Sequence, residues 1–411
     1  MLRFLIKLLK WTTILIFSFY FLAITIFGFK KSNSNGSWDF YWSGIEGLWD
    51  ADEEFGFWLD KKMIADYDGL DGPYLIHDTL YHVDMDNVLH KSEFNLNDTL
   101  SVKVNNETND SFSITIHRDY IIETETYPLA NTLIAISGIE GNFNAFSSFL
   151  IANKVIDNHY NWIFGNGSLV LNGDFIDRGN DVTQVLWLIY KLDDQSKKYG
   201  GKVHFILGNH EIMNFQGNWG YNKKKYIKIA EEISMLEDWD EALRFLFSDN
   251  SELGNWLRTK HVIEKIGDYI FVHAGLHPEI LDFSLSLGDI NSISRKHWDN
   301  NLYNNPTDDG TANFLIGRNG PFWYRGLVED YKEYYSKISE DELDDVLNYY
   351  DAKKMVIGHT VVNDISTDFN GKIIRIDLEH GKTKNSGKTK GLLIENGIEY
   401  KIDDLGNKEK L

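Results

Sequence analysis

The stretch SLVLNGDFIDRGN, Ser168 to Asn180, joins a short apolar run to a cluster of charged side chains. The run SLVL is typical of a buried β-strand, and the glycine that soon follows marks a turn. Asp174 and Asp177 are three residues apart after this turn, and Arg178 comes next. The sequence therefore predicts two carboxylates and a guanidinium at the end of a buried strand.

Four other runs share this pattern, because each is short and apolar and ends in Gly, Asp, Asn or His. They are TLIAIS (132–137), KVHFILGNH (202–210), DYIFVHAGL (268–276) and KKMVIGHT (353–360). Segments with helical spacing separate the runs, so we expect an α/β protein with buried strands. Ligands of such proteins bind at the carboxyl ends of the strands. The five polar clusters should therefore meet at one place.

These clusters contain side chains that bind divalent ions. Asn209 supplies an amide oxygen and His210 follows it, while His273 and His359 each come after an apolar run. Taken singly, each motif is more often structural, because a lone histidine at a strand end is usually packed or exposed. Together, carboxylate, amide and imidazole groups form the mixed ligand set of a hard-to-borderline divalent ion. The combination favours a metal centre.

The composition limits the classes of function. A chain of 411 residues with 43% hydrophobic side chains can bury a large core, and its length suggests two or three domains. The formal net charge of −21 leaves no general basic field for a phosphate backbone, so we predict no nucleic-acid partner. The chain has no cysteine, which excludes disulfides, a thiolate nucleophile and thiolate-bound zinc.

The uncharged run at residues 11–29, Trp11 to Phe29, is long enough to cross a hydrocarbon core of about 30 Å. We predict a single membrane span in contact with the lipid bilayer. A cleaved signal peptide and a buried core helix are the alternatives, but no small-x-small cleavage site follows the run. Basic residues lie on both sides of the run, three before it and two after it: Arg3, Lys7, Lys10, Lys30 and Lys31. This bias predicts a periplasmic or extracellular catalytic body.

The motifs GDFIDRG, GNHE, VHAGL and GHT, in this order, resemble the motif series of the calcineurin-like metallophosphoesterases. Within that superfamily they are most similar to the phosphoprotein-phosphatase branch and its bacterial Shewanella-like relatives. The segment GPFWYRG, Gly320 to Gly326, is similar to an arginine-containing segment of those bacterial members. The resemblance covers roughly residues 130 to 380 and implies a β sandwich flanked by helices, with the metal site at strand ends.

The sequence divides into three regions, of which only the last carries the resemblance. Residues 1–35 would form the membrane span and a polar linker. Residues 36–128, whose short alternating runs are broken by Asn and Asp, would form a membrane-proximal β-rich extension. Residues 129–411 would form the metallophosphoesterase domain, with a helical insertion at about 213–260 that serves either as a packed cap or as a lid over the site.

The resemblance also implies the metal ligands. Asp174 would bridge two ions, and Asn209, His273 and His359 would complete the shell of the second. A shared carboxylate lets two ions hold one hydroxide between them for attack on phosphorus. Manganese is the ion favoured, with iron, zinc or magnesium as alternatives, at one or two ions per chain.

The remaining roles concern the substrate. His210 resembles the family's proton donor to the leaving group, oriented by Asp177. Arg178 and Arg325 would clamp the phosphate oxygens, because planar guanidinium groups match phosphate geometry, and Asn209 would also contact the substrate.

The first motif departs from the family pattern. Relatives carry Gly-Asp-x-His-Gly, whose Asp and His bind the first ion, but this chain reads Ser137, Gly138, Ile139, Glu140, Gly141. Glu140 offers an oxygen ligand in place of the imidazole, which favours Mn or Mg over Zn. Gly138 leaves only room for water. We therefore expect a weak or empty first site, strengthened by an aspartate at position 138.

The function predicted from these features is a membrane-anchored, metal-dependent phosphatase that hydrolyses phosphomonoesters through a metal-bound hydroxide, with a degenerate first site. Its substrates would be small phosphate esters or phosphoproteins. The alternatives are a phosphate-binding pseudoenzyme or scaffold, and a nucleotide pyrophosphatase of the same fold. The presence of His210 and Asp177 favours the enzyme, because a pure binder needs no proton donor.

Overall fold

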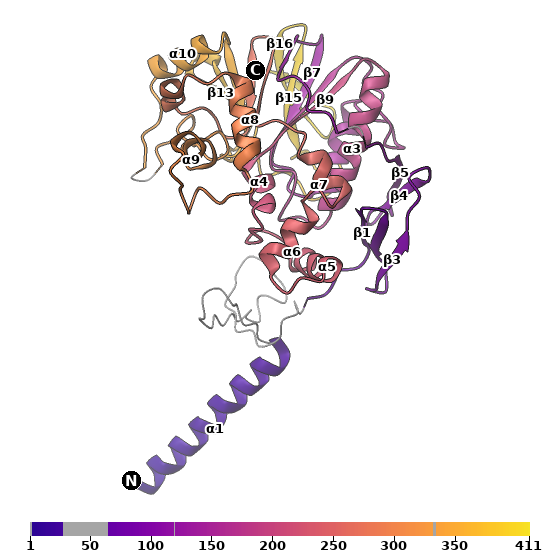
Figure 1. Cartoon of the computed structure of the whole chain (residues 1–411), viewed down its shortest axis with the longest axis vertical. Helices are drawn as coiled ribbons and strands as arrows, with labels where there is room; N and C mark the ends of the chain where they lie inside the picture. The colour runs from indigo at the N-terminus through magenta and orange to yellow at the C-terminus, as the bar shows by residue number, and fades with distance from the viewer. Residues whose placement is uncertain (1, 28–64, 119, 332–333) are drawn as a thin grey trace.

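The apolar runs form the strands of two six-stranded sheets that pack face to face (Figure 1). The computed structural model describes residues 2–27, 65–118, 120–331 and 334–411. The strands of the first sheet are β7 (Thr132–Ile136), β8 (Ser168–Asn172), β9 (Lys202–Ile206), β15 (Lys390–Glu395), β16 (Ile398–Asp403) and β17 (Lys408–Lys410). Those of the second are β6 (Thr126–Tyr127), β10 (Ile263–Ile266), β11 (Tyr269–Val272), β12 (Lys354–Ile357), β13 (Ser366–Asp368) and β14 (Ile373–Arg375).

The strand order is β17-β16-β15-β7-β8-β9 in the first sheet and β13-β14-β12-β11-β10-β6 in the second. The five predicted strands are β7, β8 and β9, which run parallel to one another, and β11 and β12, which do the same in the other sheet. Parallel strands are buried on both faces and therefore read as continuous apolar runs. The loops after these strands leave the sheets at their carboxyl ends, where α/β proteins bind ligands.

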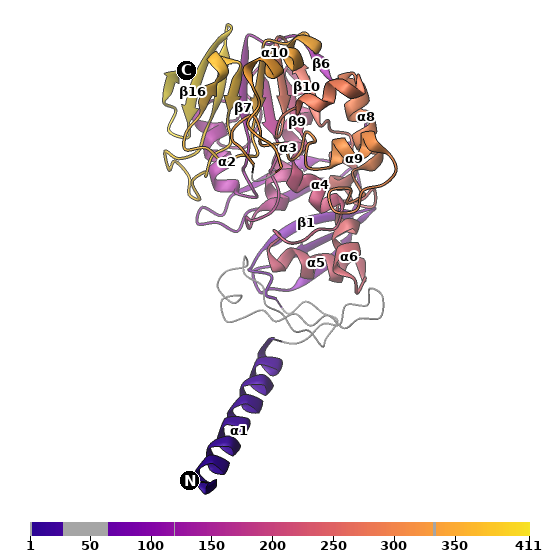
Figure 2. The same ribbon diagram turned by 90° about the vertical axis from the view of Figure 1, so that its left-hand side faces the viewer.

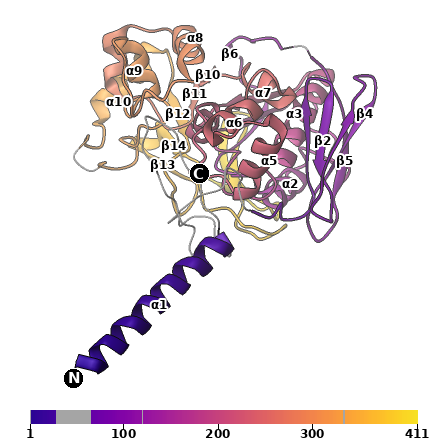
Figure 3. The ribbon, with the colours of Figure 1, turned by 60° about the horizontal axis from the view of Figure 1, so that its bottom comes forward.

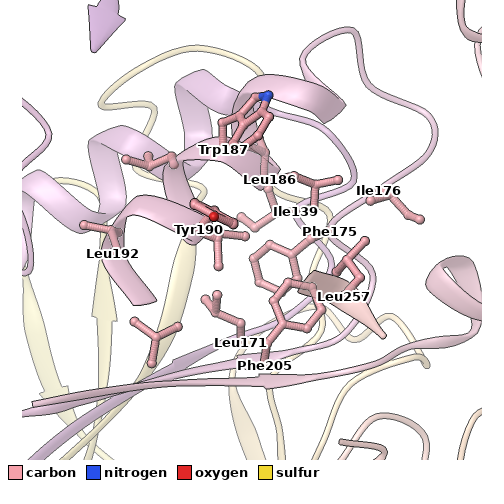
Figure 4. Packing of buried hydrophobic residues seen from close by; sticks show 14 of the residues in the cluster. Ile139, Leu171, Phe175, Ile176, Leu186, Trp187, Tyr190, Leu192, Phe205 and Leu257 are labelled. Atoms are coloured by element: carbon pink, nitrogen blue, oxygen red, sulfur yellow. The ribbon is translucent and has the colours of Figure 1, made fainter. Parts of the chain in front are cut away.

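Apolar side chains fill the space between the sheets and cover both outer faces. Leu133 and Val170 of the first sheet and Phe271 of the second are fully buried between them. The helices on the outer faces are α2 (Phe143–Ala152) and α3 (Val182–Lys198) on the first sheet, and α8 (Leu287–His297), α9 (Gly310–Ile316) and α10 (Glu340–Tyr349) on the second. Figure 4 shows Trp187 of α3 and Phe205 of β9 in the outer cluster of the first sheet. The expected sandwich flanked by helices is confirmed.

Five further strands lie beside the first sheet. They are β1 (Asp71–Ile76), β2 (Thr79–Val83) and β3 (Leu89–Glu93), which form one antiparallel sheet, and the pair β4 (Thr99–Lys103) and β5 (Ser111–Thr115). The indole N–H of Trp187 in α3 donates to the carbonyl of Pro73, at 2.7 Å. Phe112 of β5 stacks on Phe143 of α2. Figure 3 shows these strands at the side of the molecule opposite α8, α9 and α10. Residues 36–64 of the predicted extension lie outside the described residues.

A helical segment connects β9 to β10. It consists of α4 (Asn209–Phe215), α5 (Lys224–Ser234), α6 (Trp239–Leu246) and α7 (Glu252–Leu257). Helices α5 and α6 share a small core with β1, in which Tyr74 and Ile76 meet Ile229 and Leu246 (Figure 2). The segment is therefore anchored to the strands that precede the first sheet. Two 3-10 turns, η2 (Pro278–Phe283) and η3 (Phe369–Gly371), complete the elements.

The N-terminal helix α1 spans Leu2–Phe27. Its window Leu5–Leu22 is long and apolar enough to cross a membrane, and none of it is buried against the rest of the described chain. Length and composition alone support this, and an N-terminal signal sequence has the same properties. Residues 28 and 29 of the predicted span lie outside the described residues.

Candidate metal centre

The loops at the carboxyl ends of four strands bring the predicted second-site residues together. Asp174 follows β8, Asn209 follows β9 and opens α4, His273 follows β11 and His359 follows β12. One ligand atom each of Asp174, His273 and His359 lies within 4.8 Å of the others, and all three side chains are buried. Asp174 and His359 both have left-handed backbones, with φ of 61° and 62°. Such strain in non-glycine residues is often found at functional sites.

The ligand atoms of these four residues face one small space. Asn209 Oδ1 lies 3.0 Å from His273 Nε2 and 2.8 Å from His359 Nδ1. Asp174 Oδ2 lies 3.1 Å from His273 Nε2. A carboxylate oxygen, an amide oxygen and two imidazole nitrogens therefore converge, and this donor set suits a divalent ion of the Mn, Fe or Zn kind.

The surroundings of His273 and His359 determine the orientation and protonation of their imidazole rings. His273 Nδ1 lies 2.9 Å from the carbonyl of Asn172, so Nδ1 carries a proton and donates to that carbonyl, which turns Nε2 toward Asp174. Burial, reinforced by His273 and Arg325, lowers the pKa of His359 well below its ordinary value, which keeps that ring neutral. His359 Nε2 is buried without a hydrogen-bond partner among the described residues.

His210 is held beside the metal-binding group by Asp177. His210 Nδ1 lies 2.7 Å from Asp177 Oδ2, and Asn214 Nδ2 donates to Asp177 Oδ1 at 2.8 Å. Burial opposes a charge on His210, but the carboxylates of Asp174 and Asp177 outweigh it and raise its pKa to about 9. The sequence reasoning missed Asn214. Its position four residues after His210, one turn along α4, was the available signal.

Glu211, the last residue of the GNHE motif, was given no role from the sequence, and its side chain supports the turn at Asp174. Its fully buried carboxylate accepts hydrogen bonds from the backbone N–H groups of Asp174, Phe175 and Gly208, at 3.0, 2.8 and 2.7 Å. These bonds satisfy the backbone where the chain turns sharply, so Glu211 positions Asp174 rather than binding an ion itself.

The two predicted phosphate-binding arginines lie at the edge of this group. Arg178 forms a close ion pair with Glu140 and sits over the ring of Tyr221. Arg325 Nη1 donates to the carbonyl of His359 at 3.3 Å. Glu140 in turn has a carboxylate oxygen within 4.8 Å of ligand atoms of Asp174 and His210. All nine residues singled out from the sequence are thus near neighbours in the fold.

The space at Gly138 differs from what the sequence led us to expect. It is not open to water, because the carboxylate of Asp377 lies there. A Cβ atom at position 138 would meet Asp377 Oδ1 at 2.2 Å, so an aspartate added there would have to displace the Asp377 carboxylate. Burial and the nearby Asp174 raise the pKa of Asp377 to about 6. The signal for Asp377 was a further apolar run, KIIRID at 372–377, that ends in an acid as the others do.

Comparison with known proteins gives likenesses of three kinds: to a family model, to curated relatives and to a solved structure. A family model described as calcineurin-like phosphoesterase matches residues 116–363. The "Shewanella-like protein phosphatase 1" of Plasmodium berghei is 32% identical over 230 residues, which are 56% of this chain and 60% of that protein. The "Shewanella-like protein phosphatase 2" of Arabidopsis thaliana is 27% identical over 292 residues, covering 61% of this chain and 71% of its own. The chain thus spans about 60% of the length of the Plasmodium relative.

A solved structure is similar over nearly its whole length. The crystal structure of the cold-active protein-tyrosine phosphatase of a psychrophilic Shewanella species superposes with a TM-score of 0.72 at 31% sequence identity. The match covers 83% of this chain and 99% of that one. The likeness therefore extends beyond the metal-binding loops to the whole sandwich and its helices.

Proposed function

We propose a phosphatase function on the premise that the chain belongs to the calcineurin-like phosphoesterase family, whose members are metal-dependent phosphoric ester hydrolases. The reaction proposed is hydrolysis of phosphomonoesters. One observation carries the proposal: the group of Asp174, Asn209, His273 and His359 lies directly beside the buried pair of His210 and Asp177. The proposal assigns the first group to a divalent ion and His210 to the leaving group, within one site.

Each residue contributes a separate part of the reaction. Asp174, Asn209, His273 and His359 would hold a divalent ion, which when bound supplies a Lewis acid and an activated water. His210 keeps Nδ1 on Asp177, so its Nε2 is free to hold a proton for the departing oxygen. Its Nε2 lies 4.0 Å from Asp174 Oδ2, which leaves this nitrogen facing the metal-binding group.

The arginines would bind the phosphate. A guanidinium donates two parallel hydrogen bonds to a phosphate and offsets the charge that builds up on its oxygens in the transition state. The side chain of Arg178 is about 40% exposed and pairs with Glu140. Its guanidinium is therefore accessible to a phosphate that enters the site. Arg325 is held near the site by hydrogen bonds from its Nη1 to the carbonyl of His359 and the hydroxyl of Thr360.

The substrate class proposed is a phosphoprotein or a small aryl phosphate. The similar Shewanella structure is named as a protein-tyrosine phosphatase, and two curated relatives are named protein phosphatases. These likenesses support an ester of a protein side chain over a nucleotide polyphosphate. A pseudoenzyme is disfavoured because the hydrogen-bonded series His210–Asp177–Asn214 would serve no purpose in simple phosphate binding.

The test uses the full chain purified in detergent, with p-nitrophenyl phosphate, a phosphotyrosine peptide and diadenosine tetraphosphate as substrates and Mn²⁺ as the added ion. We expect hydrolysis of the first two and its loss in Asp174→Asn. A folded protein that is inactive with Mn, Fe, Zn and Mg would indicate the pseudoenzyme. Preference for the dinucleotide would indicate the nucleotide pyrophosphatase instead.

We also propose that α1 anchors the protein in a membrane, with the body in the periplasm or outside the cell. The uncharged residues from Trp11 onward and the exposure of every side chain from Leu5 to Leu22 support a span. The excess of basic residues before the span supports a cytoplasmic N-terminus. In this arrangement residues 1–35, 36–128 and 129–411 form anchor, extension and catalytic domain.

A further inference from the structure

Tyr221 lies beside both the proposed proton donor and one of the proposed phosphate-binding arginines. Its ring centroid is 5.0 Å from that of His210, and the two ring planes meet at 73°. The guanidinium carbon of Arg178 lies 5.0 Å from the centre of the same tyrosine ring. In the proposed reaction, this one side chain therefore borders both the departing oxygen and the phosphate oxygens.

The loop that carries Tyr221 is attached to the residues that perform these roles. The carbonyl of Tyr221 accepts a hydrogen bond from the backbone N–H of Arg178, at 3.0 Å. The neighbouring Asn222 donates from Nδ2 to Asn214 Oδ1 at 3.1 Å, and Asn214 in turn donates to Asp177. The loop is therefore positioned before any substrate arrives, which reduces the entropy lost on binding.

The start of α5 adds further bonds to the same turn. Lys225 Nζ and the hydroxyl of Tyr226 both donate to the carbonyl of Asn180, at 2.6 and 2.7 Å. The connection between α4 and α5 is thus bonded at several points to the turn that carries Asp177 and Arg178. None of these bonds involves the ring at position 221, so that ring can be replaced while they are kept.

The side chain of Tyr221 is exposed although it lies beside buried residues. Tyr221 is 44% exposed, whereas His210 is 3% exposed. Its contacts with His210 and Arg178 therefore leave part of the ring available to another group. Tyrosine combines a large apolar ring with a polar tip and is enriched where proteins bind their partners. The part of a substrate nearest to this ring would be the leaving group, because its oxygen takes a proton from His210.

A second aromatic ring at the site, that of Trp323, has a different position. Its centroid lies 5.8 Å from that of His359, with the two ring planes perpendicular, and Trp323 also packs against Tyr303. His359 belongs to the proposed metal-binding group and is not the proton donor. Tyr221 is therefore the better placed of the two rings to contact the leaving group.

We propose that Tyr221 is a specificity-determining residue, which packs against the aromatic ring of an aryl leaving group. The site would then bind an ester such as phosphotyrosine more tightly than an alkyl ester such as phosphoserine. Aromatic rings attract one another in offset or edge-to-face arrangements, and the side chain of serine has no ring to offer. The inference rests on the proposed phosphatase function and names the residue that selects among its substrates.

The experiment measures binding rather than turnover, on the full chain in detergent with Mn²⁺. Two peptides of the same sequence carry the non-hydrolysable phosphonate analogue of either phosphotyrosine or phosphoserine, and titration calorimetry gives the Kd of each. The variants are Tyr221→Leu, which removes the ring, Tyr221→Phe, which keeps it, and Tyr199→Leu as the matched control. Tyr199 is a 62% exposed tyrosine that follows α3.

We expect Tyr221→Leu to weaken binding of the phosphotyrosine analogue, relative to the phosphoserine analogue, by roughly 3- to 10-fold, the effect of one aromatic pair. Tyr221→Phe and Tyr199→Leu should keep the ratio of the two Kd values that the unmodified chain shows. This ratio cancels any effect that Tyr221 has on Arg178, because both analogues carry the same phosphonate group.

An equal loss for both analogues in Tyr221→Leu would overturn the proposal, because Tyr221 would then act only through Arg178 or His210. A Tyr221→Phe variant that behaves like Tyr221→Leu would also overturn it, since the hydroxyl and not the ring would be responsible.

Hydrolysis of p-nitrophenyl phosphate by the same samples separates this inference from the phosphatase function. A chain that shows the expected ratio of Kd values but hydrolyses no ester would support the contact with Tyr221 and reject the phosphatase. Hydrolysis together with an unchanged ratio in Tyr221→Leu would reject the contact and leave the enzyme in place.

Discussion

His210 Nδ1 lies 2.7 Å from Asp177 Oδ2, and both side chains are almost completely buried. This contact fixes the orientation of the imidazole, so that Nε2 is the nitrogen that faces Asp174. A histidine held in this way is suited to hold a proton and give it up at one defined place.

The first prediction follows from that orientation. His210→Asn should lower kcat/KM far more for an alkyl phosphate than for p-nitrophenyl phosphate, because a nitrophenolate leaves without help from an acid. The loss on the poor leaving group should be about 10²- to 10⁴-fold. The control is His204→Asn, which removes another buried histidine from its carboxylate partner, Glu264 at 2.6 Å. Equal losses on both substrates for His210→Asn would exclude the role of acid.

Asn214 should affect catalysis through Asp177. Asn214 Nδ2 donates to Asp177 Oδ1 at 2.8 Å, so Asn214→Ala frees the carboxylate to rotate away from His210. We expect kcat to fall while KM stays near its original value, again with the larger loss on the alkyl phosphate. Steady-state kinetics on both substrates tests this. A rise in KM with unchanged kcat would mean that Asn214 acts in binding instead.

The five strands could be predicted because parallel strands buried on both faces keep only apolar residues until they end. SLVL in β8 is one such run, and the polar residues after it lie at the site for the same reason. The apolar run KIIRID could have indicated Asp377 as a further acid at a strand end, but not its contact with the loop at Gly138, which is distant along the chain. His380 and Ser137, which join the same two segments, are 243 residues apart. A single sequence carries no trace of such a contact, so the space beside Gly138 was read as open to water.

The same limit applies to packing between regions. The alternation of apolar and polar residues in β4 and β5 shows which face of each strand is buried. It does not show that Phe112 packs against Phe143 of α2. Helix α5 is amphipathic by its spacing, yet nothing in that pattern identifies β1 as the surface that it covers. Glu211 is a similar case, because the backbone N–H groups that donate to its carboxylate leave no mark in the sequence.

The membrane orientation can be tested with reporters fused after Leu411. A reporter that is active only outside the cytoplasm should be active, and one that is active only in the cytoplasm should not. Replacing Arg3, Lys7 and Lys10 by glutamine removes the charge bias and should weaken or invert this result. A cytoplasmic reporter that is active in the unmodified chain would contradict the orientation, and intracellular phosphates would become the candidate substrates.

Low pH should lower the free energy of unfolding, in part because Asp193 becomes protonated. Burial would raise the pKa of this carboxyl, but Lys260 and Lys197 outweigh burial and lower it from 3.8 to about 2. Because the folded-state pKa is the lower one, its stabilisation is full above pH 3.8 and is lost as the pH falls toward 2. The contribution is roughly 2 kcal/mol.

Urea unfolding between about pH 6 and pH 2 measures this contribution. Asp193→Asn cannot titrate, so its free energy of unfolding should fall less steeply over the acid range than that of the unmodified chain. It should also be lower at neutral pH, where Lys260 loses a partner at 2.6 Å. Parallel pH profiles for the two proteins would show that other carboxylates dominate the acid response.

The last prediction concerns the buried ion pair between Lys225 of α5 and Asp71 of β1. The two groups lie 2.9 Å apart and are only 4% and 0% exposed, so neither charge has access to water. Lys225 Nζ also donates to the carbonyl of Asn180, just past the Asp177 turn. Lys225→Met leaves the Asp71 carboxylate buried with no cation, which should lower the free energy of unfolding by about 3 to 5 kcal/mol.

Two comparisons isolate this effect. Lys198→Met removes a surface pair with Asp194 whose lysine is 64% exposed, and it should cost less than about 1 kcal/mol. The double variant Lys225→Met/Asp71→Asn should recover much of the lost stability, because it also removes the unpaired buried charge of Asp71. Urea unfolding of the unmodified chain, the single variants Lys225→Met and Asp71→Asn, and the double variant gives the coupling energy of the pair. If Lys225→Met costs no more than Lys198→Met, the ion pair does not hold β1 to α5. Their attachment then depends on apolar contacts such as Tyr74 against Ile229.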